Sequence, residues 1–429
     1  MASETIRSGS PKDRLMRALS AGAVIFLSVG SVASVRRLLL LVAVLVFVDT
    51  MLYAALTPLL PHFAHDLHLS KARAGTLVAA YAAGALVGGL PGGWASARMG
   101  PRRAVLVGLV GMGLASVGFA FANSFSTLFL ARFVQGLGSA FTWAGSFSWL
   151  LTAAPRERRG ELIGSAMGAA VFGALFGPVI GAAAALAGRA AIFCALAGLS
   201  VVLVVWTLRL GSSPPAEVPS FAALRRALRN RQLAGGLVLM SVPSLLFGVL
   251  AVLGPLHLSH AGWGAAAIGS VWLVGAGLEA IQAPIVGRMT DRRGPLVPVR
   301  AALAVGALVS LGLATGARPL LYAPLIVIAA IAYGVLFTPA FAMIANGAEH
   351  TGLAQGMAFG LMSAAWATGA VAGPSAGGAI ATATGDWIPF VLGAVLCASM
   401  LIVVRPRFSR TGFSDRDSRR ERQPASSQQ

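Results

Sequence analysis

The stretch Gly173-Ala-Leu-Phe-Gly177-Pro178-Val-Ile-Gly181 lies inside a long apolar segment and returns later in the chain as Gly369-Ala-Val-Ala-Gly373-Pro374-Ser-Ala-Gly377-Gly378. Glycines spaced by four fall on one face of a helix, where a neighbouring helix can approach closely, and proline bends the helix by removing one backbone donor. Gly and Pro are common in membrane helices, but two matched copies indicate an internal repeat. The repeat predicts two similar membrane halves, an architecture typical of solute transporters.

The composition is that of an integral membrane protein, because 57% of the 429 residues are hydrophobic and only 11% are charged. A helix needs about 20 residues to cross a hydrocarbon layer of about 30 Å. We expect an all-α membrane protein with twelve transmembrane helices in two pseudo-symmetric six-helix bundles. The predicted spans are 38–60, 74–94, 103–122, 126–151, 161–186 and 189–210 in the first half, and 233–256, 264–286, 296–316, 319–345, 352–380 and 386–404 in the second.

These spans divide the chain into five parts. They are an amino-terminal tail (1–37), a first bundle (38–210), a linker (211–232), a second bundle (233–404) and a carboxyl-terminal tail (405–429). The linker is rich in Pro and Arg and is expected to contain a short amphipathic helix on the membrane surface. The carboxyl-terminal tail is charged and poor in apolar residues, which predicts disorder.

The positive charges predict the orientation. Of the 33 Lys and Arg residues, only Lys71, Arg73, Arg189 and Arg318 fall on one side of the predicted membrane, and Arg132 falls within a span. Because cationic loops stay in the cytoplasm, both termini are expected to be cytoplasmic, in a multi-pass protein of the cell (inner) membrane. The net charge of +19 then faces acidic lipid, and nucleic-acid binding is not expected because no basic folded domain is present.

Residues 1–37 allow three interpretations: a cytoplasmic or surface-lying tail, an extra span, or residues of an over-long gene start. We favour the tail, since an extra span would place the amino-terminal basic residues on the wrong face. Cys194 and Cys397 both fall within predicted spans and are interpreted as small core residues.

Two loops resemble a known signature. Gly93-Trp-Ala-Ser-Ala97-Arg98-Met-Gly100-Pro-Arg102-Arg103 and Gly287-Arg-Met-Thr-Asp291-Arg292-Arg293-Gly294 resemble the Gly-x-x-x-Asp-Arg-x-Gly-Arg-Arg loop of the major facilitator superfamily. The resemblance implies that these loops latch the cytoplasmic side. In the first copy Ala97 replaces the aspartate of the family, which weakens the expected latch. The gating residues that it implies are Gly93, Arg98, Gly100, Arg102, Gly287, Asp291, Arg292 and Gly294.

Three spans extend the resemblance. Arg132-Phe-Val-Gln135-Gly136 is similar to an intramembrane Arg-x-x-x-Gly motif of the superfamily, and the two Gly-Pro segments look like its antiporter motif, which is thought to suppress proton leak by packing the fifth span against the other half. Asp49-Thr-Met51-Leu52-Tyr-Ala-Ala-Leu-Thr-Pro58 resembles the first span of vesicular amine transporters and their bacterial relatives, the twelve-span drug and proton antiporters. The antiporter-motif residues are Gly173, Gly177, Pro178, Gly181, Gly369, Gly373, Pro374 and Gly377. Tyr333 and Ser363 stand where the vesicular transporters carry further acids, so a monoamine substrate is not inferred.

Two acids, Asp49 and Glu279, fall well inside predicted spans. An ionisable group in such a place is a functional candidate by default. We hypothesise that Asp49, helped by Glu279, alternates between holding a proton and holding a cationic group of the substrate, with Arg132 as a third proton-coupling residue. The alternative for Asp49 is a fixed ion pair with Arg132 that only joins two helices, and Glu279 could instead lie near an interface.

Aromatic and amide side chains in the spans suit an amphipathic organic cation through stacking and cation–π contacts. The predicted substrate-binding residues are Asp49, Tyr53, Gln135, Trp143, Trp272, Gln282, Tyr333 and Trp366. The histidines His62, His65, His68, His257 and His260 follow the first and seventh spans and are interpreted as parts of hydrated loops rather than as metal ligands.

The chain lacks a phosphate-binding Gly-x-x-x-x-Gly-Lys-Ser/Thr loop and a His-Glu-x-x-His zinc motif, so we expect no enzyme activity and no cofactor, with the proton gradient as the energy source. The expected function is proton-coupled efflux of small, amphipathic or cationic organic compounds by alternating access, performed by a monomer in the lipid bilayer. The alternatives are a symporter or facilitator for uptake of a sugar or organic acid, and a membrane sensor that has lost transport.

Overall fold

The computed structural model describes residues 35–154, 159–211, 221–353 and 355–404, and these form helices with no strand among them. The first half contains a helix over residues 35–54, α2 (Leu56–Asp66), α3 (Lys71–Met99), α4 (Pro101–Phe121), α5 (Phe125–Ala153), α6 (Arg159–Ala187) and α7 (Arg189–Arg209). A short helix, α8 (Phe221–Leu228), precedes the second half, which contains α9 (Arg231–His260), α10 (Ala265–Arg293), α11 (Leu296–Ala314), α12 (Pro319–Val335), α13 (Phe337–His350), α14 (Gln355–Thr384) and α15 (Trp387–Val403).

Nine helices of the described residues are long and apolar enough to cross a membrane, and α15 is a shorter apolar helix. The helices α5 and α14, with 29 and 30 residues, have the length to cross as well. Every predicted span therefore coincides with a helix. The predicted linker contains α8, while residues 1–34 and 405–429 of the predicted tails lie outside the described residues.

Two predicted spans are interrupted in the structure. Residues 35–66 form one candidate span with a turn at Ala55, and 319–350 form another with a turn at Leu336. A proline follows each turn by three residues, at Pro58 and Pro339. Because proline has no N–H to donate to the carbonyl four residues earlier, the helical hydrogen-bond ladder is broken at these two places.

The two glycine-rich helices pack in the same way in the two halves. A Cβ at Gly177 would collide with Ala54 of the first helix, and one at Gly373 would collide with the Leu245 carbonyl of α9. On one side of each contact a hydroxyl group ties the two helices together: Thr50 Oγ1 donates to the Ala170 carbonyl (2.9 Å), and Ser241 Oγ donates to the Ala365 carbonyl (2.8 Å). The repeat in the sequence is thus a structural repeat.

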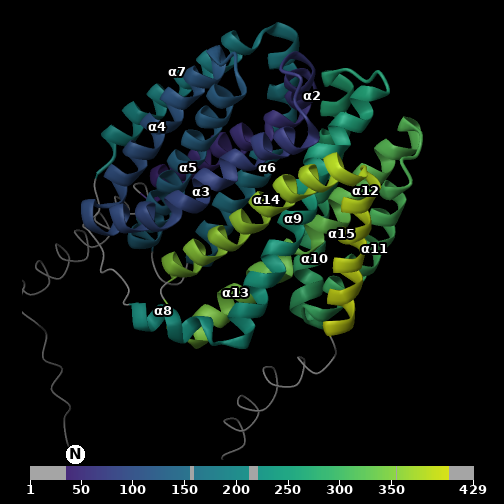
Figure 1. Cartoon of the computed structure of the whole chain (residues 1–429). Helices are drawn as coiled ribbons and strands as arrows, with labels where there is room; N and C mark the ends of the chain where they lie inside the picture. Colours follow the sequence, from purple (N-terminus) through teal and green to yellow (C-terminus); the bar gives the residue numbers. More distant parts are fainter. Residues whose placement is uncertain (1–34, 155–158, 212–220, 354, 405–429) are drawn as a thin grey trace, which may run out of the picture.

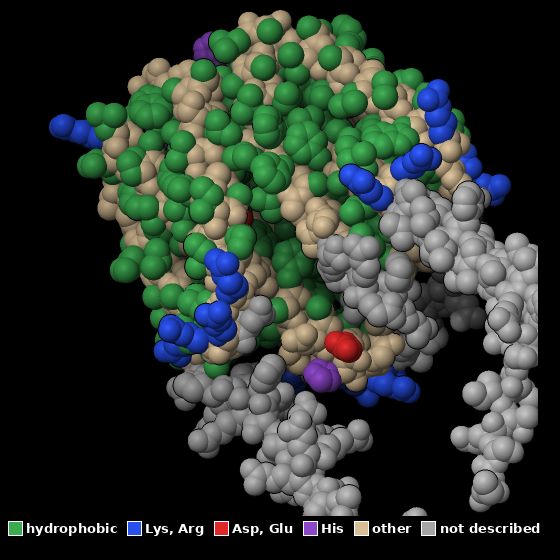
Figure 2. All heavy atoms as spheres, turned by 180° about the vertical axis from the view of Figure 1, so that it is seen from behind, with side chains coloured by type: hydrophobic (Ala, Val, Ile, Leu, Met, Phe, Trp, Pro, Cys, Tyr) green, Lys and Arg blue, Asp and Glu red, His purple; other side chains and the backbone are tan. Residues whose placement is uncertain are grey.

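Figure 1 shows the helices of the first half (purple to teal) beside those of the second (green to yellow), with α3 and α14 side by side. Since consecutive long helices run in opposite directions, their ends form two faces. We call the face with Lys71 and Arg189 the Lys71 face and the opposite one the Arg98 face. The surface in Figure 2 is mainly hydrophobic, and its Lys and Arg side chains lie at the margins, as expected for a protein surrounded by lipid.

Candidate functional site

Asp49 is buried near the middle of the candidate span 35–66, with 2% of its surface exposed. Both carboxylate oxygens accept hydrogen bonds from aromatic side chains of other helices. The Tyr81 hydroxyl of α3 donates to Oδ1 at 2.8 Å, and the Trp143 indole N–H of α5 donates to Oδ2 at 2.6 Å. A buried carboxylate needs such partners, so Asp49 is held by a built site rather than placed at random in the core.

Close packing of α3 on α5 places Tyr81 in this site. A Cβ at Gly84 would collide with the Phe133 carbonyl of α5, and one at Gly136 would collide with the Tyr81 carbonyl of α3. The absence of side chains at these two positions lets the helix backbones meet. Tyr81 consequently lies directly at the contact, beside both Asp49 and Arg132.

Arg132 is fully surrounded by protein, with 1% exposure. Its guanidinium donates to the backbone carbonyls of Leu52 (2.8 Å) and Tyr53 (3.0 Å), and to Gln135 Oε1 (3.1 Å), and it lies 4.7 Å from the centre of the Tyr81 ring. In the described part of the chain no ion pair joins it to Asp49. The alternative of a fixed Asp49–Arg132 ion pair is therefore not what this structure contains, and Arg132 instead fastens α5 to the carbonyls near the helix break at Ala55.

Aromatic contacts connect the Asp49 site to the second half. Tyr53 packs edge-on against Trp366 of α14, with 5.1 Å between the ring centres. The ring centres of Trp143 and Phe147 are 5.4 Å apart. Phe147 in turn stacks on Phe359 of α14, with 4.9 Å between the ring centres and 11° between the ring planes. Through Trp143 and Phe147, the group that holds Asp49 is in contact with the other half. We call the set Asp49, Tyr53, Tyr81, Arg132, Trp143, Phe147, Phe359 and Trp366 the Asp49 cluster.

Gln135 belongs to the buried surroundings of this cluster, where its Nε2 donates to Ser116 Oγ at 3.2 Å. Four other predicted site residues lie in the second half. Glu279 is half-buried on α10, against Gly334 of α12, and has no hydrogen bond or ion pair among the described residues. Gln282 donates to the Ile331 carbonyl at 2.8 Å.

Trp272 and Tyr333 complete this second group. Trp272 packs against Gly254 of α9. Tyr333 is 1% exposed, and its hydroxyl lies 2.8 Å from Ser310 Oγ of α11. The hydrogen bonds and ring contacts of this group reach other residues of the second half, and among the described residues none of them joins the group to the Asp49 cluster.

The halves are joined at the Lys71 face. Lys71 Nζ lies 2.5 Å from Asp386 Oδ1, and the Ala72 backbone N–H donates to Thr382 Oγ1 at 2.9 Å. One turn further, a Cβ at Gly75 would collide with the Pro374 carbonyl of α14. The second Gly-Pro segment thus seals one end of the contact between the halves.

The antiporter-motif glycines face their own half. Gly173 and Gly181 meet backbone carbonyls of the first-helix segment, and Gly369 meets a carbonyl of α9. The Pro178 carbonyl also faces Gly269 of α10 in the other half. Helix α6 therefore contacts the other half through Pro178, as the resemblance implies for the fifth span. Its motif glycines contact the first half instead.

The two loops of the predicted latch end their helices alike. Gly100 and Gly294 both have positive φ, at 88° and 78°, a conformation that favours glycine. Arg98 lies over the Trp94 ring at 4.9 Å, and Arg102 donates to the Leu208 carbonyl at 2.5 Å. Of the other predicted gating residues, Gly93 has open space around it, Gly287 lies near Thr338, Arg292 is exposed, and the Asp291 side chain lies outside the described residues.

Sequence reasoning missed Tyr81, Phe147, Phe359 and the Lys71–Asp386 pair. Tyr81 had a signal: it lies one turn before Gly84, Gly88 and Gly92, whose spacing by four marks a close helix contact. The other partners are far apart in the sequence and follow no pattern that one chain could reveal. The described residues contain no group of three or more His, Cys, Asp or Glu side chains that could hold a metal ion.

Comparison with known proteins places these features in a wider group. The family model described as Major Facilitator Superfamily matches residues 42–359. The chain is 26% identical over 333 residues to an uncharacterized MFS-type transporter, YcaD, from Escherichia coli, covering 76% of this chain and 84% of that protein. It is 37% identical over 114 residues to a probable vesicular acetylcholine transporter-B from Danio rerio, covering 25% of this chain and 23% of that protein.

The chain aligns with only about a quarter of the length of the first curated relatives that it matches. Among solved structures, a mutant of the nucleoside transporter NupG superposes with a TM-score of 0.67 and 14% identity, covering 86% of this chain and 99% of that one. At this identity the likeness concerns the fold alone.

Proposed function

Because the chain belongs to the major facilitator superfamily and is a multi-pass membrane transporter, we propose that it exports small amphipathic organic cations in exchange for protons. The observation that carries this proposal is the Asp49 carboxylate, buried at 2% exposure and held by the donors Tyr81 and Trp143. A titratable group inside a membrane-spanning bundle can bind a proton or a cation, and it binds the two in competition.

The surroundings of Asp49 support a cationic substrate. Tyr53, Tyr81, Trp143 and Trp366 present aromatic rings within one connected set of contacts, and aromatic faces attract organic cations. One relative is named as a probable acetylcholine transporter, and acetylcholine is itself an organic cation. Arg132 donates to the carbonyls of Leu52 and Tyr53 and forms no ion pair with Asp49 among the described residues, so it leaves the carboxylate oxygens to other partners.

The proposed cycle moves the two halves against each other. The contacts of Lys71 with Asp386 and of Gly75 with Pro374 support a state closed at the Lys71 face, which the charge distribution predicts to be the outer one. A proton or a cation arriving at Asp49 competes with the Trp143 N–H for the carboxylate. Because Trp143 packs on Phe147 and Phe147 stacks on Phe359, we infer that this exchange alters the contact between the halves.

Glu279 is proposed as a second proton-binding group. Its carboxylate has no hydrogen-bonding partner in the described part of the chain, so a proton would remove an uncompensated charge from a half-buried place. The proton gradient supplies about 2.3 kcal/mol per charge for each 100 mV of membrane potential, in addition to its pH component.

The proposal is tested with purified protein in liposomes, under an imposed pH gradient and with ethidium as the probe cation. We expect ethidium to move against the proton flow, and Asp49→Asn to abolish this movement. Glu349→Gln, which changes an exposed acid of α13, is the matched control and should transport like the wild type. Retained exchange in Asp49→Asn would remove Asp49 from the mechanism.

The same liposomes separate the alternatives. Movement of ethidium in the direction of the protons would indicate a symporter. An absence of both ethidium and proton movement for the wild type, repeated with a panel of toxic cations, sugars and organic acids, would favour the sensor.

A further inference from the structure

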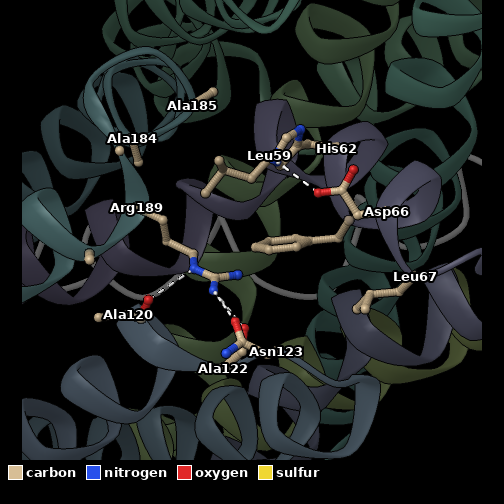
Figure 3. Close-up of a pocket in the computed structure, with 13 residues that line it drawn as sticks. Leu59, His62, Asp66, Leu67, Ala120, Ala122, Asn123, Ala184, Ala185 and Arg189 are labelled. Carbon is tan, nitrogen blue, oxygen red and sulfur yellow. Dashed lines mark hydrogen bonds and ion pairs between the residues drawn. The ribbon is translucent and has the colours of Figure 1, made fainter.

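A pocket of about 490 Å³ lies in the first half at the Lys71 face, away from the Asp49 cluster. It is lined by residues of α2, by the C-terminal ends of α4 and α6, and by the start of α7 (Figure 3). All of its lining residues belong to the first half. Movement of the two halves against each other would therefore not open or close this pocket, whereas a transported solute binds between the halves.

One side of the pocket is cationic. Arg189, the first residue of α7, donates to the Ala120 carbonyl (3.1 Å), to the Ala122 carbonyl (2.6 Å) and to Asn123 Oδ1 (3.4 Å), and its guanidinium lies 5.2 Å from the Phe63 ring centre. These bonds use Nε and Nη2. Among the described residues Nη1 has no hydrogen-bonding partner, which leaves two N–H donors of a rigid fork for an anionic ligand.

The other side is acidic. Asp66 lies across the pocket from Arg189 (Figure 3) and accepts from His62 at 3.1 Å, and its side chain is 48% exposed. His65 Nδ1 lies 3.4 Å from the other carboxylate oxygen, and a carboxylate has about four acceptor sites, more than the two histidines use. The pocket therefore offers an anion-binding group and a cation-binding group at opposite sides, with an apolar floor between them formed by Leu59, Phe63, Ala120, Ala184 and Ala185.

Apolar side chains next to the pocket face outward. Phe121 and Leu186, which neighbour the lining residues Ala120 and Ala185 in the sequence, are 61% and 76% exposed. At the end of membrane-spanning helices such side chains lie among lipid acyl chains close to the headgroups. A ligand with charged groups in the pocket and hydrocarbon beside Phe121 and Leu186 would satisfy both environments.

We propose that this pocket binds the headgroup of an aminophospholipid, with the phosphate at Arg189 and the primary ammonium at Asp66. Arg binds phosphate through paired N–H donors. Asp66 has histidines beside it rather than an aromatic cage, so an ammonium group that donates hydrogen bonds fits better than a quaternary one. A phosphatidylethanolamine has both charged groups and the acyl chains.

The test is native mass spectrometry of the whole detergent-purified protein with dihexanoyl phosphatidylethanolamine, the corresponding phosphatidylcholine and phosphatidylglycerol, and glycerophosphoethanolamine, which has no acyl chains. We expect phosphatidylethanolamine to bind about tenfold more tightly than phosphatidylcholine, since one charge-assisted hydrogen bond distinguishes them. Asp66→Asn should remove this preference, and Glu349→Gln should keep it.

Three results would overturn the proposal. They are equal binding of the three lipids by the wild type, an unchanged preference in Asp66→Asn, and binding of glycerophosphoethanolamine as tight as that of the lipid, which would indicate a site for a soluble solute. Because Arg189 also holds the end of α4, Ala185→Phe serves as the second variant. By filling the pocket while leaving the charges in place, it should reduce phosphatidylethanolamine binding.

Discussion

The contact between Gly75 and α14 predicts that a single methyl group at this position opens the Lys71 face. In the structure a Cβ on Gly75 would collide with the Pro374 carbonyl oxygen and lie 2.9 Å from its carbon, closer than side-chain carbons approach a backbone. Overpacking of this kind costs about 1–3 kcal/mol. This steric cost arises only in the closed state, in which α3 and α14 touch at Gly75. Gly75→Ala should therefore lower the ratio of closed to open molecules by about 5- to 150-fold.

Two glycines of the same helix provide matched controls. Gly89 has open space around it, so Gly89→Ala should change nothing but the local helix propensity, which is the same in the two states. Gly84 faces the Phe133 carbonyl within the first half, so Gly84→Ala should lower thermal stability without favouring either state.

The assay is a spin-label distance measurement across the Lys71 face in reconstituted protein. Labels at His65 of α2 and Thr315 after α11 report from the two halves, in a background that lacks Cys194 and Cys397. Gly75→Ala should transfer population from the short to the long distance. A folded Gly75→Ala protein whose distances equal those of Gly89→Ala would refute the assignment of this contact as a closure.

Three further predictions concern the ion pair and the Asp49 cluster. Lys71→Ala should change the ratio of closed to open molecules in the same direction by no more than about fivefold, because a partly exposed pair contributes up to about 1 kcal/mol. The double variant Lys71→Asp/Asp386→Lys, which exchanges the two charges, should restore the wild-type ratio, and a swap that fails to do so contradicts a gating role for the pair. Trp143→Phe removes an N–H donor to Asp49 and should slow ethidium exchange about tenfold; wild-type exchange would show that the bond has no part in transport. Arg132→Lys keeps the charge but replaces the two terminal nitrogens of the guanidinium, which reach the Leu52 and Tyr53 carbonyls separately, by a single ammonium nitrogen. This change should lower the thermal denaturation midpoint in detergent, and an unchanged midpoint contradicts the structural role.

The sequence predicted the scaffold well because the scaffold follows from local patterns. Apolar length predicted the helices, and the matched Gly-Pro segments predicted two similar halves, which the contacts of Gly177 and Gly373 now explain. The breaks at Ala55 and Leu336 could also have been predicted, since Pro58 and Pro339 were visible.

The site was predictable only in part. Asp49 and Arg132 stood out because charges are rare in membrane spans, but whether they pair depends on where side chains from three helices meet. The sequence suggested that Asp49 and Arg132 could neutralise each other. In the structure the Asp49 carboxylate instead accepts hydrogen bonds from Tyr81 and Trp143, and the Arg132 guanidinium donates to the Leu52 carbonyl. Tyr333 was assigned to the substrate as an aromatic side chain within a predicted span, and nothing in the sequence indicated that its hydroxyl lies 2.8 Å from Ser310 Oγ.

The two halves share a scaffold but differ in chemistry, and this difference bears on the coupling proposed for Asp49. Thr50 and Ser241 are structural counterparts, since each donates to a carbonyl of the glycine-rich helix of its own half. The residue before Thr50 is Asp49, and the residue before Ser241 is Met240. The two copies share the hydroxyl that holds the helices together and differ at the neighbouring position, where Asp49 can bind a proton and Met240 cannot. The residues that break the internal symmetry are therefore those on which the transport chemistry is expected to depend, whereas the repeated glycines determine how the helices pack.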